Sequence, residues 1–166
     1  MRDYIIMTDS CCDLSQQEVE ELELTVLPLS FTIEGKTLLN TPDHADMSPE
    51  EFFQKIAAGA DCTTAAVNVG QFTDAMEKVL QEGKDILCVC FSSALSTTYQ
   101  SACIAAEDLR EKYPEAKILV IDSLSASRGQ GMLLYRAVRE RREKNLTIDE
   151  LDAYVRSIIQ SQCHWF

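Results

Sequence analysis

The sequence predicts an α/β fold in which helices cover both faces of a mostly parallel central sheet. The run Asp85–Phe91 is apolar without alternation, which is typical of a central strand in a parallel sheet that is covered on both faces. Segments with helical periodicity separate this run from two other short apolar runs, Tyr4–Met7 and Ala116–Asp122. Such alternation of strands and helices is typical of βαβ units, and a length of 166 residues fits one domain.

The first half of the chain predicts two strands, two helices and a hairpin turn. The expected elements are a strand at Tyr4–Met7, a helix at Ser15–Leu24, a strand at Thr25–Ile33 and a helix from Ser48 to Gly59. Ser15 and Glu18 match a capping box at the start of the first helix. Gly35 indicates the turn of a hairpin after the second strand. Pro49 suits the first turn of the second helix.

The second half predicts further βαβ units and two helices near the end. The expected elements are a loop to Gly70, a helix closed by Gly83, the strand Asp85–Phe91, a helix at Tyr99–Tyr113, the strand Ala116–Asp122, a helix at Ser123–Lys144 and a helix at Thr147–Gln162. Pro114 ends the helix Tyr99–Tyr113, since proline does not continue a helix. The apolar residues 163–166 are expected to begin a second domain that this chain lacks, which leaves 1–162 as the first domain.

The charge balance argues against nucleic-acid and membrane partners. The formal net charge is -12 and the sequence pI is about 4.5, whereas nucleic-acid binders and binders of anionic membranes carry basic patches. Glu140 and Glu143 interrupt the only basic cluster, Arg136–Lys144, so we interpret it as a solvated helix face. No apolar run approaches the ~20 residues of a membrane helix, and Asp9 interrupts the first apolar run too early for a signal peptide. We therefore expect a cytoplasmic protein without a membrane span.

Seven cysteines show no metal-binding spacing. No CxxC pair occurs, and Cys88 and Cys90 lie in the most apolar strand, where a thiol behaves as a small hydrophobic group. An odd number of cysteines without a secretory signal indicates reduced thiols. We expect neither a metal site nor a cofactor.

Polar side chains follow three of the predicted strands. They are Thr8–Asp9–Ser10, Ser92–Ser93 and Asp122–Ser123. Ligands of open parallel sheets bind at the carboxyl ends of the strands, so this edge is the expected site. The segment Cys62–Asn68, expected to be a loop before a helix, is able to reach the same edge.

Five hydroxyl side chains lie between the strand Asp85–Phe91 and the next helix. They are Ser92, Ser93, Ser96, Thr97 and Thr98. One interpretation is helix capping, because a helix start has unsatisfied N–H groups that serine or threonine can satisfy. The other is an anion site, in which hydroxyls and the positive helix end hold a carboxylate or phosphate. The segment lacks the glycines and the lysine of a nucleotide P-loop.

Two enzymatic interpretations have little support. No GxSxG motif surrounds a serine, and the possible bases are His44, in a predicted loop, and His164, near the chain end. Phosphoryl transfer at Asp9 requires a second carboxylate, and Asp13 is poorly spaced for that role. We expect a protein that is not an enzyme.

Five motifs resemble the DegV family of bacterial fatty-acid-binding proteins, of which this chain matches the N-terminal domain only. They are "MTDSCCDL" (Met7–Leu14), "LPLSFTIEGK" (Leu27–Lys36), "TTAAVNVGQF" (Thr63–Phe72), "SSALSTTYQSA" (Ser92–Ala102) and "VIDSLSASRGQG" (Val120–Gly131). Together they span nearly the whole chain, and the serine-rich motif is the most specific of them.

The resemblance implies a two-domain carrier that holds a long-chain fatty acid near the cleft between its domains. It implies that Thr64, with Thr63 as its neighbouring alternative, and Ser96 hold the carboxylate. The polar strand ends add Ser93, Asp9 and Ser10 as candidate ligand-binding residues. Some members deliver the acyl group to a separate fatty acid kinase that makes acyl phosphate, which implies a role in phospholipid synthesis.

The chain departs from the family pattern in three ways. Thr97 replaces a glycine after Ser96, and "TAAV" (Thr64–Val67) replaces a threonine-serine-glutamine-proline run. The second domain, which normally supplies a glycine-glycine-arginine segment and a late histidine, is expected to be missing. The alternative hypothesis is therefore a truncated relative that binds no ligand tightly and self-associates, as a homodimer, through an exposed apolar patch.

The acyl chain requires an apolar channel, for which one set of residues offers two interpretations. The set comprises Ala102, Ala105 and Ala106 beside Leu133, Leu134 and Val138. These side chains leave a channel against the sheet, or they make ordinary close helix–sheet packing.

Overall fold

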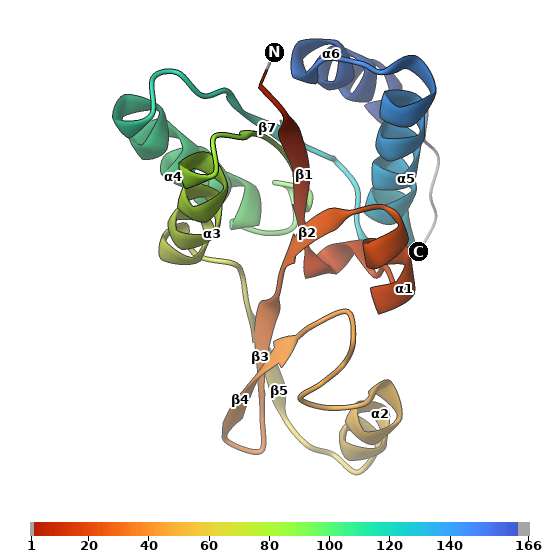
Figure 1. Cartoon of the computed structure of the whole chain (residues 1–166). Coiled ribbons are helices and arrows are strands. Elements are labelled where there is room, and N and C mark those ends of the chain that lie inside the picture. The colour runs from red at the N-terminus through yellow and green to blue at the C-terminus, as the bar shows by residue number, and fades with distance from the viewer. Residues whose placement is uncertain (1, 163–166) are drawn as a thin grey trace.

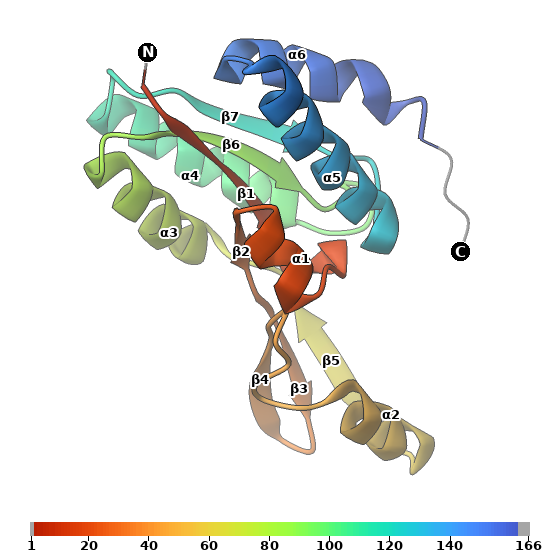
Figure 2. The ribbon, with the colours of Figure 1, turned by 45° about the vertical axis from the view of Figure 1, so that its right-hand side comes forward.

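Four parallel strands form the central sheet, in the order β2-β1-β6-β7 (Figures 1 and 2). They are β1 (Tyr4–Asp9), β2 (Leu24–Leu27), β6 (Asp85–Cys90) and β7 (Ile118–Asp122). All six residues of β6 are buried, as the apolar run without alternation predicts. The computed structural model describes residues 2–162, so the expected start of a second domain at 163–166 lies outside the described residues.

Helices cover both faces of this sheet (Figure 2), which confirms the predicted fold class. One face carries α1 (Gln16–Glu21), α5 (Ser127–Lys144) and α6 (Ile148–Ile159), and the other carries α3 (Val69–Gln81) and α4 (Thr98–Lys112). Successive side chains of a strand point to opposite faces, so Leu87 and Val89 pack on the α5 side, whereas Cys88 and Cys90 pack on the α4 side. Among the helices of residues 2–162, none has the length and apolar character needed to cross a bilayer.

A small antiparallel lobe extends beyond the carboxyl ends of β1 and β2 (Figure 1). It contains β3 (Leu29–Ile33), β4 (Lys36–Asn40) and β5 (Cys62–Ala65), in the order β4-β3-β5, together with α2 (Pro49–Ala57). The prediction of one strand at Thr25–Ile33 was wrong. Pro28 lacks the N–H that a continuous strand donates to its ladder, and the chain passes there from the parallel sheet into the lobe.

The expected loop before Gly70 also contains a strand. β5 pairs with β3, with Thr64 opposite Phe31. The segment is short and largely exposed, so it carries no alternating apolar pattern from which a strand can be predicted. Pairing with β3 supplies its hydrogen bonds.

The lobe is held by its turn and by one ion pair. Glu34 and Gly35 both have positive φ, 50° and 74°, which is the geometry of a two-residue hairpin turn. Ser48 caps α2 and Pro49 begins it, as predicted. Lys55 Nζ lies 2.7 Å from a carboxylate oxygen of Glu34 and so ties α2 to the hairpin.

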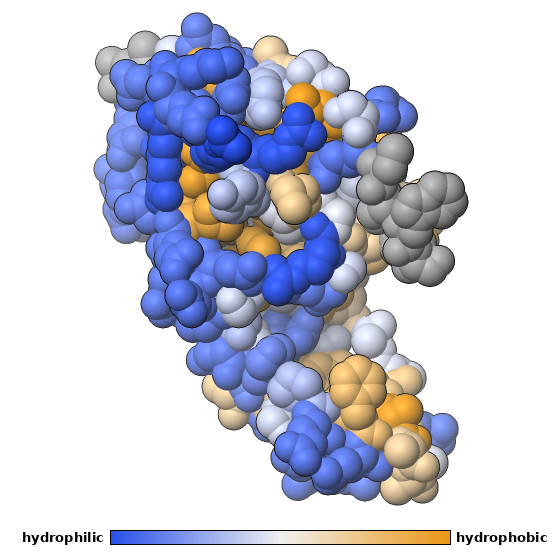
Figure 3. Space-filling view, turned by 90° about the vertical axis from the view of Figure 1, so that its right-hand side faces the viewer, coloured by the Kyte–Doolittle hydropathy of each residue, from blue (hydrophilic) through white to orange (hydrophobic). Residues whose placement is uncertain are grey.

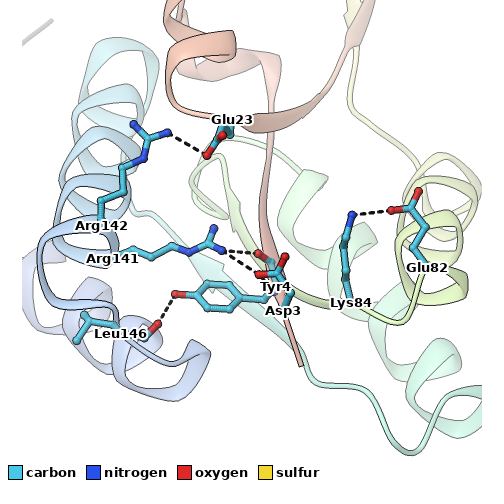
Figure 4. Close-up of polar contacts among 8 residues, drawn as sticks. All are labelled: Asp3, Tyr4, Glu23, Glu82, Lys84, Arg141, Arg142 and Leu146. Atoms are coloured by element: carbon cyan, nitrogen blue, oxygen red, sulfur yellow. Dashed lines mark hydrogen bonds and ion pairs between the residues drawn. The ribbon is translucent and has the colours of Figure 1, made fainter. Parts of the chain in front are cut away.

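The start of β1 is anchored to α5 and to the turn that follows it (Figure 4). The Tyr4 hydroxyl donates to the carbonyl oxygen of Leu146 at 2.8 Å. Arg141 donates to the carbonyl oxygen of Tyr4 at 2.9 Å, and its guanidinium carbon lies 4.0 Å from the centre of the Tyr4 ring. Arg142 pairs with Glu23 at 3.1 Å. Two of the four arginines in the basic cluster Arg136–Lys144 therefore make contacts with β1 and the turn before β2, which corrects its interpretation as a purely solvated helix face.

Helix α5 approaches the turn after β1 so closely that one position requires glycine. A Cβ atom added to Gly131 would lie 2.8 Å from the carbonyl oxygen of Cys12 and 3.0 Å from a methyl carbon of Leu14. Cys12 belongs to the short helix η1 (Ser10–Cys12). The contact fixes η1 against α5.

We expect Gly131→Ala to lower the free energy of unfolding by about 1–3 kcal/mol, because overpacking a tight contact carries a cost of that size. The higher helix propensity of alanine offsets at most about 1 kcal/mol of this loss. Urea denaturation measures the change. Met132→Ala, on the 53% exposed neighbour, is the control and is expected to change stability by under about 0.5 kcal/mol. Equal stability of Gly131→Ala and the wild type would contradict the close approach.

Glu18 links α1 to the start of α5. Its two carboxylate oxygens accept from Arg128 Nη1 at 2.7 and 2.9 Å. One of them also accepts from the backbone N–H of Ser15 at 2.8 Å, which completes the predicted capping box. The Arg128 contact first, and the Ser15 contacts second, lower the pKa of Glu18 to about 2.

A carboxyl whose pKa is lowered by folding stabilises the fold above its unfolded pKa and loses that effect as the pH falls through the folded pKa. We therefore expect the wild type to lose more stability than Glu18→Gln between about pH 4.5 and pH 2. The pair is exposed, so the difference is under about 1 kcal/mol. Chemical denaturation at several pH values measures it, and parallel pH profiles would refute the assignment.

Candidate functional site

A groove lies where the sheet topology changes direction. From β1 the chain moves outward to β2, and from β6 it moves outward to β7 on the other side. The segments that follow β1 and β6 therefore diverge and leave a crevice at the carboxyl ends of the strands. The groove between this edge and the small lobe has a volume of about 500 Å³.

The structure brings Thr64 and Ser96 to this one groove. Thr64 lies on β5, opposite Phe31, and Ser96 lies in the loop before α4. The Ser96 hydroxyl lies 2.9 Å from the Thr98 hydroxyl and accepts from the Thr98 backbone N–H at 3.2 Å. Two hydroxyl groups from distant parts of the sequence thus line a single groove.

Some side chains of the hydroxyl cluster stabilise the loop before α4, and others lie close to the groove. Ser92 is buried and accepts from the Ala94 N–H at 3.3 Å. Thr97, the residue before α4, makes no side-chain capping bond. Capping therefore accounts for part of the cluster, through Ser96 and Thr98, and the start of α4 adjoins the groove.

Thr63 and Ser93 lie outside the groove lining. Thr63 is opposite Thr32 on β3. Since neighbouring residues of a strand point to opposite faces, Thr63 points away from the face that carries Thr64. The Ser93 N–H donates to a carboxylate oxygen of Asp122 at 3.1 Å, which makes it part of the loop scaffold.

Asp9 and Ser10 are buried, bind other parts of the chain and do not line this groove. Asp9 accepts from the N–H groups of Phe91 and Cys11 at 2.8 and 3.0 Å. Burial raises the pKa of Asp9, and these hydrogen bonds oppose the rise. The Ser10 hydroxyl accepts from the Leu29 N–H at 3.0 Å and so fastens the lobe to the sheet.

The apolar wall of the groove comes from the small lobe rather than from the helices proposed for it. The predicted channel residues of α4 (Ala102, Ala105, Ala106) and of α5 (Leu133, Leu134, Val138) are buried in separate clusters on opposite faces of the sheet. The sheet separates them, so they make close helix–sheet packing and share no channel. The apolar residues that line the groove are Leu29, Phe31, Leu39, Met47, Pro49, Phe52, Phe53, Ala66, Phe91 and Leu95.

Sequence reasoning missed this wall because it depends on packing within the lobe. The rings of Phe31 and Phe52 meet edge to face, with their centres 5.5 Å apart. The rings of Phe52 and Phe53 also meet edge to face, with their centres 5.4 Å apart. The sequence feature that could have indicated this apolar wall was the pair of adjacent phenylalanines on α2, a helix that lies far from the main core. Phe53 is 66% exposed and Leu95 59% exposed. Figure 3 shows hydrophobic side chains on the surface of the lobe.

Cys11 is the thiol at the polar side of the groove. Burial, followed by the nearby Asp9 and Asp13 charges, raises its pKa to about 12. The Cys11 thiol is therefore uncharged near neutral pH and suits neither metal binding nor nucleophilic attack. Within residues 2–162, no three His, Cys, Asp or Glu side chains are arranged to hold a metal ion.

The sequence matches a known family and several of its curated relatives. A family described as "Uncharacterised protein, DegV family" matches residues 4–166. A DegV domain-containing protein of Clostridium perfringens is 36% identical over 166 residues, which is 100% of this chain and 56% of the relative. One from Lactococcus lactis is 38% identical and is matched over 83% of this chain and 47% of its own length. The chain spans about half the length of these relatives.

Solved structures share the fold. A stearic acid-binding protein from Eubacterium ventriosum superposes with a TM-score of 0.82 at 27% identity, over 92% of this chain and 52% of that one. A DegV family protein from Thermus thermophilus, described by its fatty acid binding, gives a TM-score of 0.82 at 29% identity, over 96% and 54% of the two chains.

The raised pKa of Cys11 predicts slow alkylation. At pH 8 a thiol of pKa about 12 is ionised in only about one molecule in ten thousand. We expect its reaction with iodoacetamide to accelerate steadily up to pH 10. Peptide mapping by mass spectrometry measures the rate, with a short unstructured cysteine peptide as the control. Alkylation as fast as that of the peptide at pH 8 would contradict this environment.

Proposed function

The chain belongs to the DegV family, and on this premise we propose that it binds a long-chain fatty acid and does not transform it. The carboxylate lies at Ser96 and Thr64, and the acyl chain lies along the aromatic wall of the lobe. The observation that carries the proposal is a single groove that joins two hydroxyl side chains to a continuous apolar lining.

The polar side of the groove suits a carboxylate. Hydroxyls donate to carboxylate oxygens, and the start of α4 adds the positive end of a helix dipole. Each charge-assisted hydrogen bond contributes about 1.5–3 kcal/mol. Ser96 accepts from the N–H of Thr98, the first residue of α4, whereas Thr97 makes no capping bond, so the other N–H groups in the first turn of α4 are left for an anion.

The apolar side suits an acyl chain. Burial contributes about 0.8 kcal/mol for each CH2 group, and ordering the chain subtracts several kcal/mol. Phe31 and Phe52 are half-buried and line the groove, and their edge-to-face contact holds both rings in its wall. Similarity to the stearic acid-binding protein of Eubacterium ventriosum and to the fatty-acid-binding protein of Thermus thermophilus supports the same ligand class.

We further propose a carrier role in the cytoplasm, in which the protein presents its ligand to a fatty acid kinase for phospholipid synthesis. The exposed rim of the groove, with Phe53 and Leu95 at the surface, supports exchange of the ligand with a partner protein. His44 lines the groove together with the hydroxyls of Thr64 and Ser96, but among the described residues no hydrogen bond joins the His44 ring to either hydroxyl, and the Cys11 thiol is protonated near neutral pH. This supports binding rather than catalysis.

The test is the double variant Ser96→Ala with Thr64→Ala. We expect its affinity for palmitate to fall at least about 100-fold, since two charge-assisted hydrogen bonds are lost. Native mass spectrometry with lipid extraction identifies any fatty acid that co-purifies, and isothermal titration measures Kd. The single variant Thr63→Ala is the matched control, because it removes the same hydroxyl from the other face of β5.

Retention of palmitate by the double variant would remove Ser96 and Thr64 from the site. A wild-type protein that takes up no fatty acid and forms dimers would favour the second hypothesis, a relative that self-associates through its exposed apolar residues. Sedimentation velocity distinguishes monomer from dimer. Comparison of the unfolding free energies of all variants separates loss of binding from loss of fold.

A further inference from the structure

We propose that Asp9 is a positioning residue of the groove, which holds the segments after β1 and β6 at the separation that a ligand requires. The inference rests on the proposed function and deepens it, because it names a residue that acts on the ligand through others. Asp9 is 0% exposed and does not line the groove.

Each oxygen of the Asp9 carboxylate accepts a hydrogen bond from one residue of the groove lining. Oδ2 accepts from the Phe91 N–H at 2.8 Å, and Oδ1 accepts from the Cys11 N–H at 3.0 Å. Phe91 and Cys11 both line the groove. Phe91 also begins the loop that carries Ser96, so the Asp9–Phe91 hydrogen bond fixes the starting point of that loop.

Asp9 is itself held rigidly. The Thr8 hydroxyl donates to the Val89 carbonyl oxygen at 2.7 Å and accepts from Gln130 Nε2 at 2.9 Å. These buried bonds connect β1 to β6 and to α5 directly beneath Asp9. Because its backbone is fixed in this way, the Asp9 carboxylate sets the positions of both N–H groups that donate to it.

A carboxylate is required because both bonds need an acceptor. Asparagine offers one oxygen, and its NH2 group would face one of the two N–H donors.

The thiols near Asp9 carry no charge near neutral pH. Burial raises the pKa of Cys11 to about 12 and that of Cys12 to about 11, and the hydrogen bond with Cys88, followed by burial, raises the pKa of Cys90 well above its usual range. Asp13 is a second carboxylate in this part of the chain, and its charge adds to the rise in the pKa of Cys11 and Cys12.

Asp122 provides a control at the same edge of the sheet in which one oxygen, which asparagine retains, serves both donors. Its Oδ1 accepts from the N–H groups of Ser93 and Leu124, each at 3.1 Å. This carboxylate also follows a parallel strand and also fixes two loop segments. Neither Ser93 nor Leu124 lines the groove.

The experiment compares Asp9→Asn with Asp122→Asn in the full chain. We expect the Kd for palmitate to rise at least tenfold in Asp9→Asn and less than threefold in Asp122→Asn. Amide NMR is expected to show upfield proton shifts at Phe91 and Cys11 in Asp9→Asn alone, because those N–H groups lose a charged acceptor. Wild-type affinity in Asp9→Asn, or equal weakening in both variants, would overturn the proposal.

A pH profile of the wild type tests the same idea if Asp9→Asn fails to fold. Burial raises the pKa of Asp9, partly opposed by the hydrogen bonds from the Phe91 and Cys11 N–H groups. Protonation turns one acceptor into an O–H group as the pH falls through that pKa. We expect affinity for hexadecyl sulfonate, whose head group does not titrate, to fall on acidification. A flat profile in the wild type would contradict the proposal.

These measurements separate the two claims. A wild type that binds neither palmitate nor hexadecyl sulfonate would refute the proposed function, and with it the role of Asp9 toward a ligand. A wild type that binds both, together with an Asp9→Asn variant of equal affinity, would refute the positioning role alone.

Discussion

The parallel pairing of β1 with β6 is the constraint on which the site depends. The register sets Tyr4 opposite Asp85 and Thr8 opposite Val89, so the two strands end together and Asp9 reaches the N–H of Phe91. Every residue of β6 is buried, so helices cover its pairing with β1 on both faces. The chain then diverges on either side of the pair, which leaves the crevice that the groove occupies.

The small lobe converts this crevice into a groove. The chain leaves the parallel sheet at Pro28 and returns to the main body through α3. Ser10 fastens the entry by accepting from the Leu29 N–H, and Phe31 and Phe52 pack on the side that faces the sheet edge. The lobe has little core of its own, since Ile33 is its one fully buried apolar residue among those described. Its position relative to the sheet therefore depends on a few hydrogen bonds at its base.

Polar groups at the sheet edge have different roles according to burial. Asp9, Ser10 and Ser92 are buried and bind the backbone, because a buried polar group without a partner is costly. Ser96 and Thr64 retain access to the groove. A polar residue at the end of a parallel strand is thus as much a structural clamp as a ligand contact, and burial distinguishes the two roles.

The sequence by itself determined the order of the main strands and helices, the capping box of α1 and the start of α2 at Pro49, because local periodicity and capping chemistry depend on short stretches. Motif resemblance added Ser96 and Thr64 as candidate ligand-binding residues. Only the tertiary structure decided that β2 and β3 are separate strands, that β5 is a strand, and that Thr64 rather than Thr63 faces the groove. It also placed the alanines of α4 and the leucines of α5 on opposite faces of the sheet. Such facts depend on which distant segments pair and pack, and no single stretch of sequence carries that information.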